Sequence, residues 1–157
     1  MSGTKAHQTQ TPRTGGCLCG AVRYVAADVP HHMHVCHCTI CRRISGFATL
    51  SVTIPFSAMH IDGAQSVVTY ASSDWATRSF CGRCGAGLWF RMRDDDADYI
   101  ISAGTLDDLT GLDITREIYV DTKPAAYALA GQHERLTGPE FEATLNANPE
   151  GVSHDPA

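Results

Sequence analysis

Seven cysteines in three short clusters constrain this chain of 157 residues more than any other feature of its sequence. Three of them fall within six residues, in Cys36-His37-Cys38-Thr39-Ile40-Cys41. The other four form two pairs, Cys17-Leu18-Cys19 and Cys81-Gly82-Arg83-Cys84. Clusters this tight, and an odd total, indicate metal binding or catalysis rather than a disulfide framework.

The spacing within each pair suits a shared metal ion. The two-residue gap between Cys81 and Cys84 lets both sulfurs face one ion, and the flanking glycines permit the tight turn that this requires. In an extended strand, residues two apart such as Cys17 and Cys19 point to the same side. Together the two pairs would form a closed tetrathiolate site, as at structural zinc. The remaining three thiols would leave an open fourth position, as at catalytic zinc: Cys36, Cys38 and Cys41.

A rival assignment joins only the two CxxC units, Cys38/Cys41 and Cys81/Cys84, in one zinc-ribbon site. The chain would then be a non-catalytic zinc-binding module for a protein or small-molecule partner, and three cysteines would have no assigned role. A zinc deaminase is excluded because the H-x-E motif paired with P-C-x-x-C is absent.

Length and composition predict one globular domain. The hydrophobic fraction is 43% and the charged fraction 18%, and no apolar run approaches the ~20 residues that span a bilayer. We expect a flexible N-terminal arm at 1–14, a zinc-binding domain at 15–145 and a tail at 146–157. The N-terminus lacks the apolar core of a signal peptide, which predicts a cytoplasmic protein without membrane contact.

Charge argues against nucleic-acid binding. The formal net charge is −5, and the 12 lysines and arginines form no basic stripe. The sequence does not indicate an oligomeric state.

The local patterns predict a mainly β fold, predominantly antiparallel. Short runs rich in β-branched and aromatic residues are separated by Gly, Asp, Ser and Pro, and the run at 47–54 alternates apolar with small polar residues. Only the end of the chain is predicted to be helical, because Thr137 and Glu140 form a capping box and Asn148-Pro149 would stop the helix. The predicted strands are 21–25, 47–54, 67–70, 88–91, 99–102 and 114–120.

The order CxC, CxCxxC, CxxC resembles the glutathione-dependent formaldehyde-activating enzyme family, which also includes centromere protein V. The similarity runs from about Gly15 to about Tyr127 and extends beyond cysteine. It covers Gly15-Gly16-Cys17-Leu18-Cys19-Gly20-Ala21-Val22-Arg23-Tyr24, Cys36-His37-Cys38-Thr39-Ile40-Cys41-Arg42-Arg43, Phe80-Cys81-Gly82-Arg83-Cys84-Gly85 and Gly104-Thr105-Leu106-Asp107-Asp108.

The resemblance implies an antiparallel β-tent (Mss4-like) fold with a structural and a catalytic zinc. Cys17, Cys19, Cys81 and Cys84 would hold the structural ion, and Cys36, Cys38 and Cys41 the catalytic one. The implied activity is that of S-(hydroxymethyl)glutathione synthase, a carbon-sulfur lyase that adds glutathione or a similar thiol to formaldehyde or a similar small aldehyde.

Other polar residues near the central cluster are candidates for ligand contact. Arg42 and Arg43 could clamp the carboxylates of a glutathione-like ligand, or only compensate the negative charge of the metal cluster. One of four nearby histidines could supply a fourth metal ligand or move protons, although a solvated or locally hydrogen-bonded state is the simpler expectation: His31, His32, His34 and His37.

Overall fold

The structure is a computed structural model that describes residues 12–147. Strands dominate it, and two α-helices accompany them. The elements are β1 (Arg13–Gly16), β2 (Arg23–Ala26), β3 (His32–Cys36), α1 (Thr39–Ser45), β4 (Thr49–Ile54), β5 (Met59–Asp62), β6 (Val67–Ala71), β7 (Ala76–Cys81), β8 (Gly87–Met92), β9 (Tyr99–Ser102), β10 (Asp113–Ile118), β11 (Glu134–Leu136) and α2 (Gly138–Ala147).

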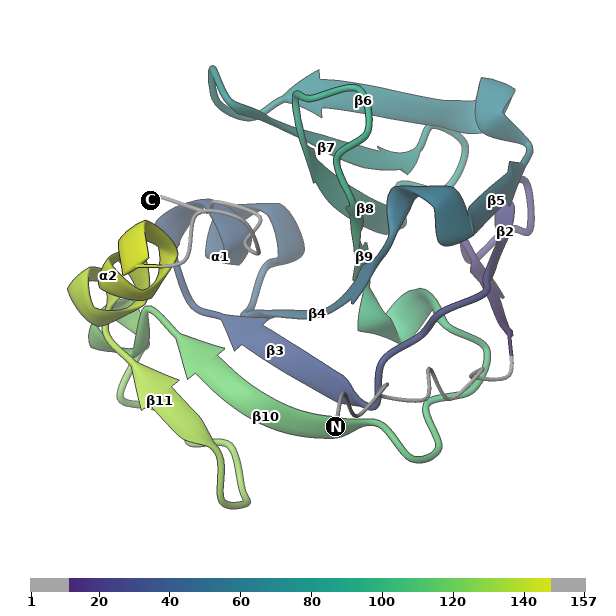
Figure 1. The fold of residues 1–157 in the computed structure, drawn as a ribbon. Coiled ribbons are helices and arrows are strands. Elements are labelled where there is room, and N and C mark those ends of the chain that lie inside the picture. The colour runs from purple at the N-terminus through teal and green to yellow at the C-terminus, as the bar shows by residue number, and fades with distance from the viewer. Residues whose placement is uncertain (1–11, 148–157) are drawn as a thin grey trace, which may run out of the picture.

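The strands form two sheets. A small sheet has the order β1-β2-β5, and a large one has the order β11-β10-β3-β4-β9-β8-β7-β6. Figure 1 shows that the large sheet is strongly bent, with β6 to β8 on one wing, β3 and β10 on the other, and α1 between the wings. The prediction of a mainly β, tent-like fold is confirmed.

Two strand pairings in the large sheet are parallel, which the sequence did not predict. Strand β10 runs parallel to both β3 and β11, and all other pairings within the described residues are antiparallel. Parallel neighbours need a long connection, and most of the domain lies between β3 and β10. The register places Ile118 beside Cys36, so β10 borders the central cysteine cluster.

The main core lies between the two sheets, and alternation along β4 decides what faces it. Val52 and Ile54 are fully buried in the core, whereas Thr49, Ser51 and Thr53 line the opposite, concave side of the large sheet. Successive strand residues point to opposite faces, so the period-two pattern of small polar residues in the sequence creates a polar wall.

A helix follows directly on the central cysteines, and the expectation of helix only near the end of the chain was therefore wrong. The N-cap of α1 is Cys38, whose sulfur accepts a hydrogen bond from the Cys41 backbone N–H at 3.4 Å. Gly46 closes the helix with a φ of 74°. Caps are normally Ser, Thr, Asp or Asn, so a helix of seven residues capped by a cysteine carries no usual sequence signal.

Helix α2 confirms the predicted C-terminal helix. Its capping box forms as expected, since the Thr137 backbone N–H donates to Glu140 Oε2 at 2.8 Å and the Glu140 N–H donates back to Thr137 Oγ1 at 3.4 Å. Strand β1 begins at Arg13, inside the predicted arm 1–14. The remaining arm residues before 12, the stop at Asn148-Pro149 and most of the tail 146–157 lie outside the described residues. No helix between residues 12 and 147 is long and apolar enough to cross a membrane.

One glycine at the edge of the core permits a test of this packing. Gly63 has a φ of 77°, and a Cβ there would lie 1.9 Å from the Ala21 carbonyl oxygen. Gly63→Ala is therefore expected to destabilise the domain by at least about 2 kcal/mol, through left-handed strain plus overpacking. The matched control is Gly111→Ala, where φ is also 77° but the Cβ meets nothing within 4 Å. Chemical denaturation of both variants measures the difference, and equal losses would contradict the close approach.

Candidate metal centres and the adjoining cleft

The two outer cysteine pairs meet in one group. The sulfurs of Cys17, Cys19, Cys81 and Cys84 all lie within 4.8 Å of one another. The Sγ of Cys19 lies 3.6 Å from that of Cys17 and 3.8 Å from that of Cys81. A tetrahedral zinc with Zn–S bonds of about 2.3 Å requires S···S separations of about 3.8 Å. The group therefore fits a zinc ion.

Local turns hold these sulfurs in place. Gly85 takes a φ of 76°, which lets its N–H donate to the Cys81 carbonyl at 2.8 Å and turn the chain between the two ligands. The Val22 N–H donates to the Cys17 sulfur at 3.3 Å. Burial raises the pKa of Cys17, but this hydrogen bond and those from the neighbouring thiols outweigh burial and lower the pKa to about 6. The site thus favours a thiolate, the form that binds metal.

The three central sulfurs form a second, separate group. Cys36 ends β3, Cys38 caps α1 and Cys41 lies in its first turn. Their sulfurs lie within 4.8 Å of one another, and all three residues are buried. The structure therefore contradicts the zinc-ribbon alternative, because Cys81 and Cys84 lie with Cys17 and Cys19 rather than with Cys38 and Cys41.

The pKa values of the three central cysteines also fit a metal site, because the thiols of this group shift one another's pKa values in opposite directions. Hydrogen bonds from Cys36 and Cys41 lower the pKa of Cys38 to about 2, and hydrogen bonds with Cys38 and Cys41, together with burial, raise the pKa of Cys36. The cluster by itself favours one thiolate that its neighbours stabilise by keeping their protons. Three thiolates this close and this buried repel one another, so they require a cation between them.

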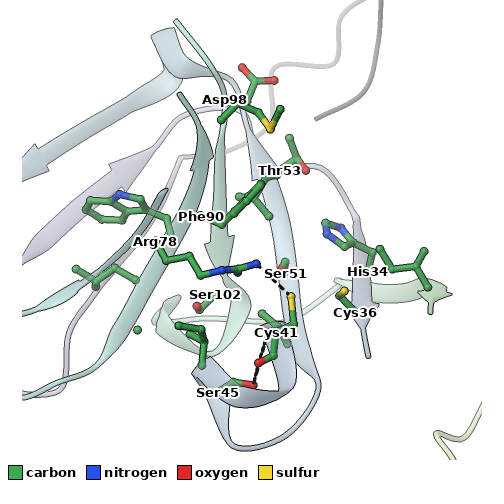
Figure 2. A pocket seen from close by; sticks show the side chains of 18 of the residues that line it. His34, Cys36, Cys41, Ser45, Ser51, Thr53, Arg78, Phe90, Asp98 and Ser102 are labelled. Atoms are coloured by element: carbon green, nitrogen blue, oxygen red, sulfur yellow. Dashed lines mark hydrogen bonds between the residues drawn. The ribbon is translucent and has the colours of Figure 1, made fainter. Parts of the chain in front are cut away.

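A cleft of about 1090 Å³ opens on two of the three cysteines. It occupies the concave side of the large sheet, and Cys36 and Cys41 line it while Cys38 does not. Figure 2 shows these two sulfurs near each other among the residues that line the cleft. Its wall carries small hydroxyl side chains from β4 and β9: Thr49, Ser51, Thr53 and Ser102. The cysteine cluster is therefore accessible to a small polar molecule.

One arginine reaches the cysteine cluster from β7. The Nη2 of Arg78 lies 3.6 Å from the sulfur of Cys41, and its guanidinium lies over the Phe90 ring, 4.9 Å from the centroid. Arg78 is only 7% exposed and lines the cleft (Figure 2). The sequence analysis missed this residue, since only the sheet register brings it near a cysteine 37 positions away.

The two arginines proposed from sequence lie elsewhere on α1. Arg42 is partly buried and donates to the Thr122 carbonyl at 3.4 Å, and Arg43 is exposed. Neither belongs to the residues that line the cleft. Their role in ligand binding stays a prediction, and the arginines that line the cleft are Arg78 and Arg116.

The four histidines have separate surroundings. His31 is exposed, His32 and His34 line the cleft, and His37 is buried and is not among the residues that line it. Burial, with the nearby charges of Arg116 and His32, lowers the pKa of His34 to about 4, so its ring is neutral at pH 7. Among residues 12–147, the group of potential ligand atoms around Cys36 contains three sulfurs and no histidine nitrogen. A metal ion held by these three sulfurs would have a fourth position for an exogenous ligand.

Comparison with known proteins gives one family match and two similar proteins with printed names. Residues 12–122 match the family model described as glutathione-dependent formaldehyde-activating enzyme. An uncharacterised lyase of Schizosaccharomyces pombe is 30% identical over 133 residues, which cover 83% of this chain and 95% of the yeast protein. A Halomonas elongata protein, named as a putative glutathione-dependent formaldehyde-activating enzyme, is 35% identical over 83 residues, 48% of this chain and 53% of that protein.

Among solved structures, a crystal structure of a Rhodobacter sphaeroides protein is similar, with a TM-score of 0.49 and 24% identity. The match covers 60% of this chain and 87% of the other.

Proposed function

The chain belongs to the glutathione-dependent formaldehyde-activating enzyme family, and we propose that it is a zinc-dependent carbon-sulfur lyase of the S-(hydroxymethyl)glutathione synthase type. Its substrates would be glutathione or a similar small thiol and formaldehyde or a similar small aldehyde. The observation that carries this proposal is the position of the three-cysteine cluster, which opens through Cys36 and Cys41 into the polar cleft. A closed site in a non-catalytic module would not need that access.

The roles of the residues follow from this geometry. Cys36, Cys38 and Cys41 would hold the catalytic zinc, while Cys17, Cys19, Cys81 and Cys84 would hold the structural one. Zinc at the first site would convert a bound thiol to the thiolate, which is the form that attacks a carbonyl carbon. In the addition a sulfur–carbon bond forms, the carbonyl π bond breaks, and the thiol proton ends on the former carbonyl oxygen.

Arg78 has two properties that suit this reaction. Its positive charge lies against Cys41 and offsets the formal charge of −1 that three thiolates and one Zn²⁺ would carry. Its guanidinium also lines the cleft, where N–H donors could stabilise the negative charge that develops on the aldehyde oxygen. Stacking on Phe90 restricts the guanidinium and so preorganises it.

Arg78→Met is therefore expected to lower kcat/KM by about 10²- to 10³-fold, the usual cost of losing an oxyanion donor. Arg78→Lys retains the charge but not the planar fork, so its loss should be smaller. Steady-state kinetics with glutathione and formaldehyde provide the measurement. The same assay on Arg42→Met and Arg43→Met tests the prediction made for those two residues. A wild-type kcat/KM for Arg78→Met would show that Arg78 takes no part in the reaction.

The experiment that tests the proposed function is measurement of the exchange rate between formaldehyde, glutathione and their adduct by NMR. We expect the rate to rise in proportion to the concentration of the zinc-loaded protein. Rates equal to those of the protein-free mixture at every protein concentration would overturn the assignment for this thiol and aldehyde pair.

A further inference from the structure

His37, between two of the central cysteines, has all of its polar groups engaged. Its backbone N–H donates to the Ile118 carbonyl at 3.1 Å, and its own carbonyl accepts from Thr122 Oγ1 at 3.0 Å. Its ring contacts Tyr127 Oη through Nδ1 at 3.1 Å and Glu117 Oε2 through Nε2 at 2.8 Å. The residue as a whole is only 1% exposed. Such a residue has little freedom to rotate.

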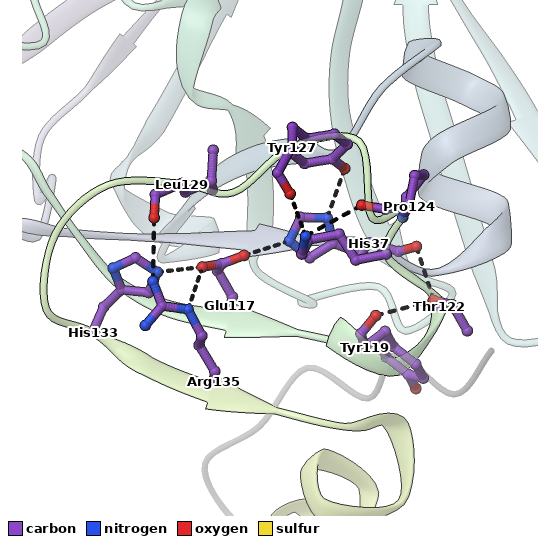
Figure 3. Close-up of polar contacts among 10 residues, drawn as sticks. His37, Glu117, Tyr119, Thr122, Pro124, Tyr127, Leu129, His133 and Arg135 are labelled. Carbon is purple, nitrogen blue, oxygen red and sulfur yellow. Dashed lines mark hydrogen bonds and ion pairs between the residues drawn. The ribbon is translucent and has the colours of Figure 1, made fainter.

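Glu117 is the centre of this network. It is 0% exposed, and its second oxygen accepts from His133 Nε2 and, at 3.0 Å, from Arg135 Nε. Figure 3 shows the carboxylate between the two histidines, with Arg135 beside it. Burial opposes ionisation, but the hydrogen bonds from His133 and His37 outweigh it and place the pKa of Glu117 below its ordinary value. An ionised carboxylate only accepts hydrogen bonds, so in this contact His37 Nε2–H is the donor and Glu117 Oε2 the acceptor.

The network joins the cysteine cluster to a part of the chain beyond the family match, which ends at residue 122. Tyr127, His133 and Arg135 all lie past that point, and Arg135 Nη2 also binds the Leu129 carbonyl at 3.2 Å. A buried carboxylate with three donors from two segments of the chain is strongly constrained, because its bonds are charge-assisted and those from His37 and His133 are buried.

This constraint acts on the backbone between two metal ligands. Cys36, the last residue of β3, and Cys38, whose backbone is extended with a φ of −58° and a ψ of 160°, flank His37. Alternation along an extended chain would direct their sulfurs to the side opposite its ring. Before a metal binds, only hydrogen bonds among the thiols draw these sulfurs together, and as three thiolates they would repel one another. The His37 ring is held in the protein interior by Glu117 and Tyr127. Because this fixes the backbone between Cys36 and Cys38, it keeps both sulfurs in the arrangement that the metal needs.

We propose that Glu117 is a positioning residue for the three-cysteine site, acting through its hydrogen bond to His37 Nε2 to preset the metal-binding geometry. The inference rests on the proposed metal binding at Cys36, Cys38 and Cys41. It assigns to Glu117 no contact with substrate or metal. Loss of a hydrogen bond of this kind around a metal site typically costs 10- to 100-fold in metal affinity.

The test compares two substitutions of the same residue. A glutamine side chain places its amide nitrogen near the position of His Nε2 and can still bind Glu117, whereas the shorter asparagine reaches only the position of Nδ1. His37→Asn is expected to bind zinc at the three-cysteine site about 10- to 100-fold more weakly than wild type, and His37→Gln is expected to retain most of the affinity. Titration of the zinc-loaded full chain with a competing chelator measures this, and Cys38→Ser identifies which zinc is lost.

Two further variants keep the test decisive if His37→Asn does not fold. Glu117→Gln should weaken zinc binding in the same direction, while Tyr127→Phe, which removes only the other partner of the ring, should not. Equal zinc affinity in His37→Asn and His37→Gln, or in Glu117→Gln and Tyr127→Phe, would overturn the positioning role alone. Absence of zinc at this site in the wild-type chain would overturn the proposed function as well.

Discussion

Replacement of Cys81 by serine is expected to leave the protein insoluble or readily unfolded. Cys81 is fully buried, and its sulfur lies in one group with those of Cys17 and Cys19, more than sixty positions earlier in the chain. Zinc in this group would cross-link the first loop of the small sheet to the end of β7. A structural zinc contributes on the order of 10 kcal/mol, which is comparable with the ~5–15 kcal/mol stability of a whole domain.

Thermal melting and soluble yield measure this loss. Cys81→Ala should show the same defect, which separates the missing metal ligand from the effect of burying a serine hydroxyl. Removal of metal from the wild-type chain with a strong chelator should reproduce it. A Cys81→Ser protein that melts close to wild type would show that the four-cysteine group is not a structural metal site.

Replacement of Cys38 by serine is expected to affect function and not folding, unlike replacement of Cys81. The fold survives, and one zinc ion and the activity are lost. The three-cysteine site is built within six residues, so its metal cross-links little chain. Serine is also a favoured helix N-cap, so it can replace the Cys38 sulfur in the hydrogen bond that begins α1. We expect the melting temperature to change by less than about 4 °C, equivalent to roughly 1 kcal/mol.

Parallel measurements of melting temperature, zinc content and adduct-exchange rate on Cys38→Ser test this profile. If this variant unfolds as severely as Cys81→Ser, the division into a structural and a catalytic zinc is wrong. If it retains full activity, the reaction does not depend on the three-cysteine site.

The two cysteine groups could be predicted because the spacing within each cluster is local information and a count of ligands suggests how the clusters combine. Spacing within each cysteine cluster sets which sulfurs can share an ion, and counting ligands separates a group of four from a group of three. The grouping of Cys17 and Cys19 with Cys81 and Cys84 is present in the structure. The polar wall of the cleft is also visible in the sequence, as the alternation of Thr49, Ser51 and Thr53 along β4.

The residues around the ligands could not be predicted because long-range pairing places them. Arg78 meets Cys41 only through the register of the large sheet, and nothing in its own surroundings in the sequence distinguishes it. Glu117 lies in a run that was correctly predicted as a strand, but its burial depends on His133 and Arg135 from a later segment. The expectation for His37 was of a solvated or locally bonded ring, whereas its ring partners are 80 and 90 positions away.

The number of zinc ions per chain tests the central claim most directly. The claim is that seven cysteines form two independent metal sites, one of which adjoins the cleft. Protein purified without chelators is expected to contain two zinc ions per chain, as the two ligand groups require, and Cys38→Ser is expected to contain one. A single zinc in the wild-type chain that Cys38→Ser retains would contradict a metal at the three-cysteine site, and with it the proposed chemistry.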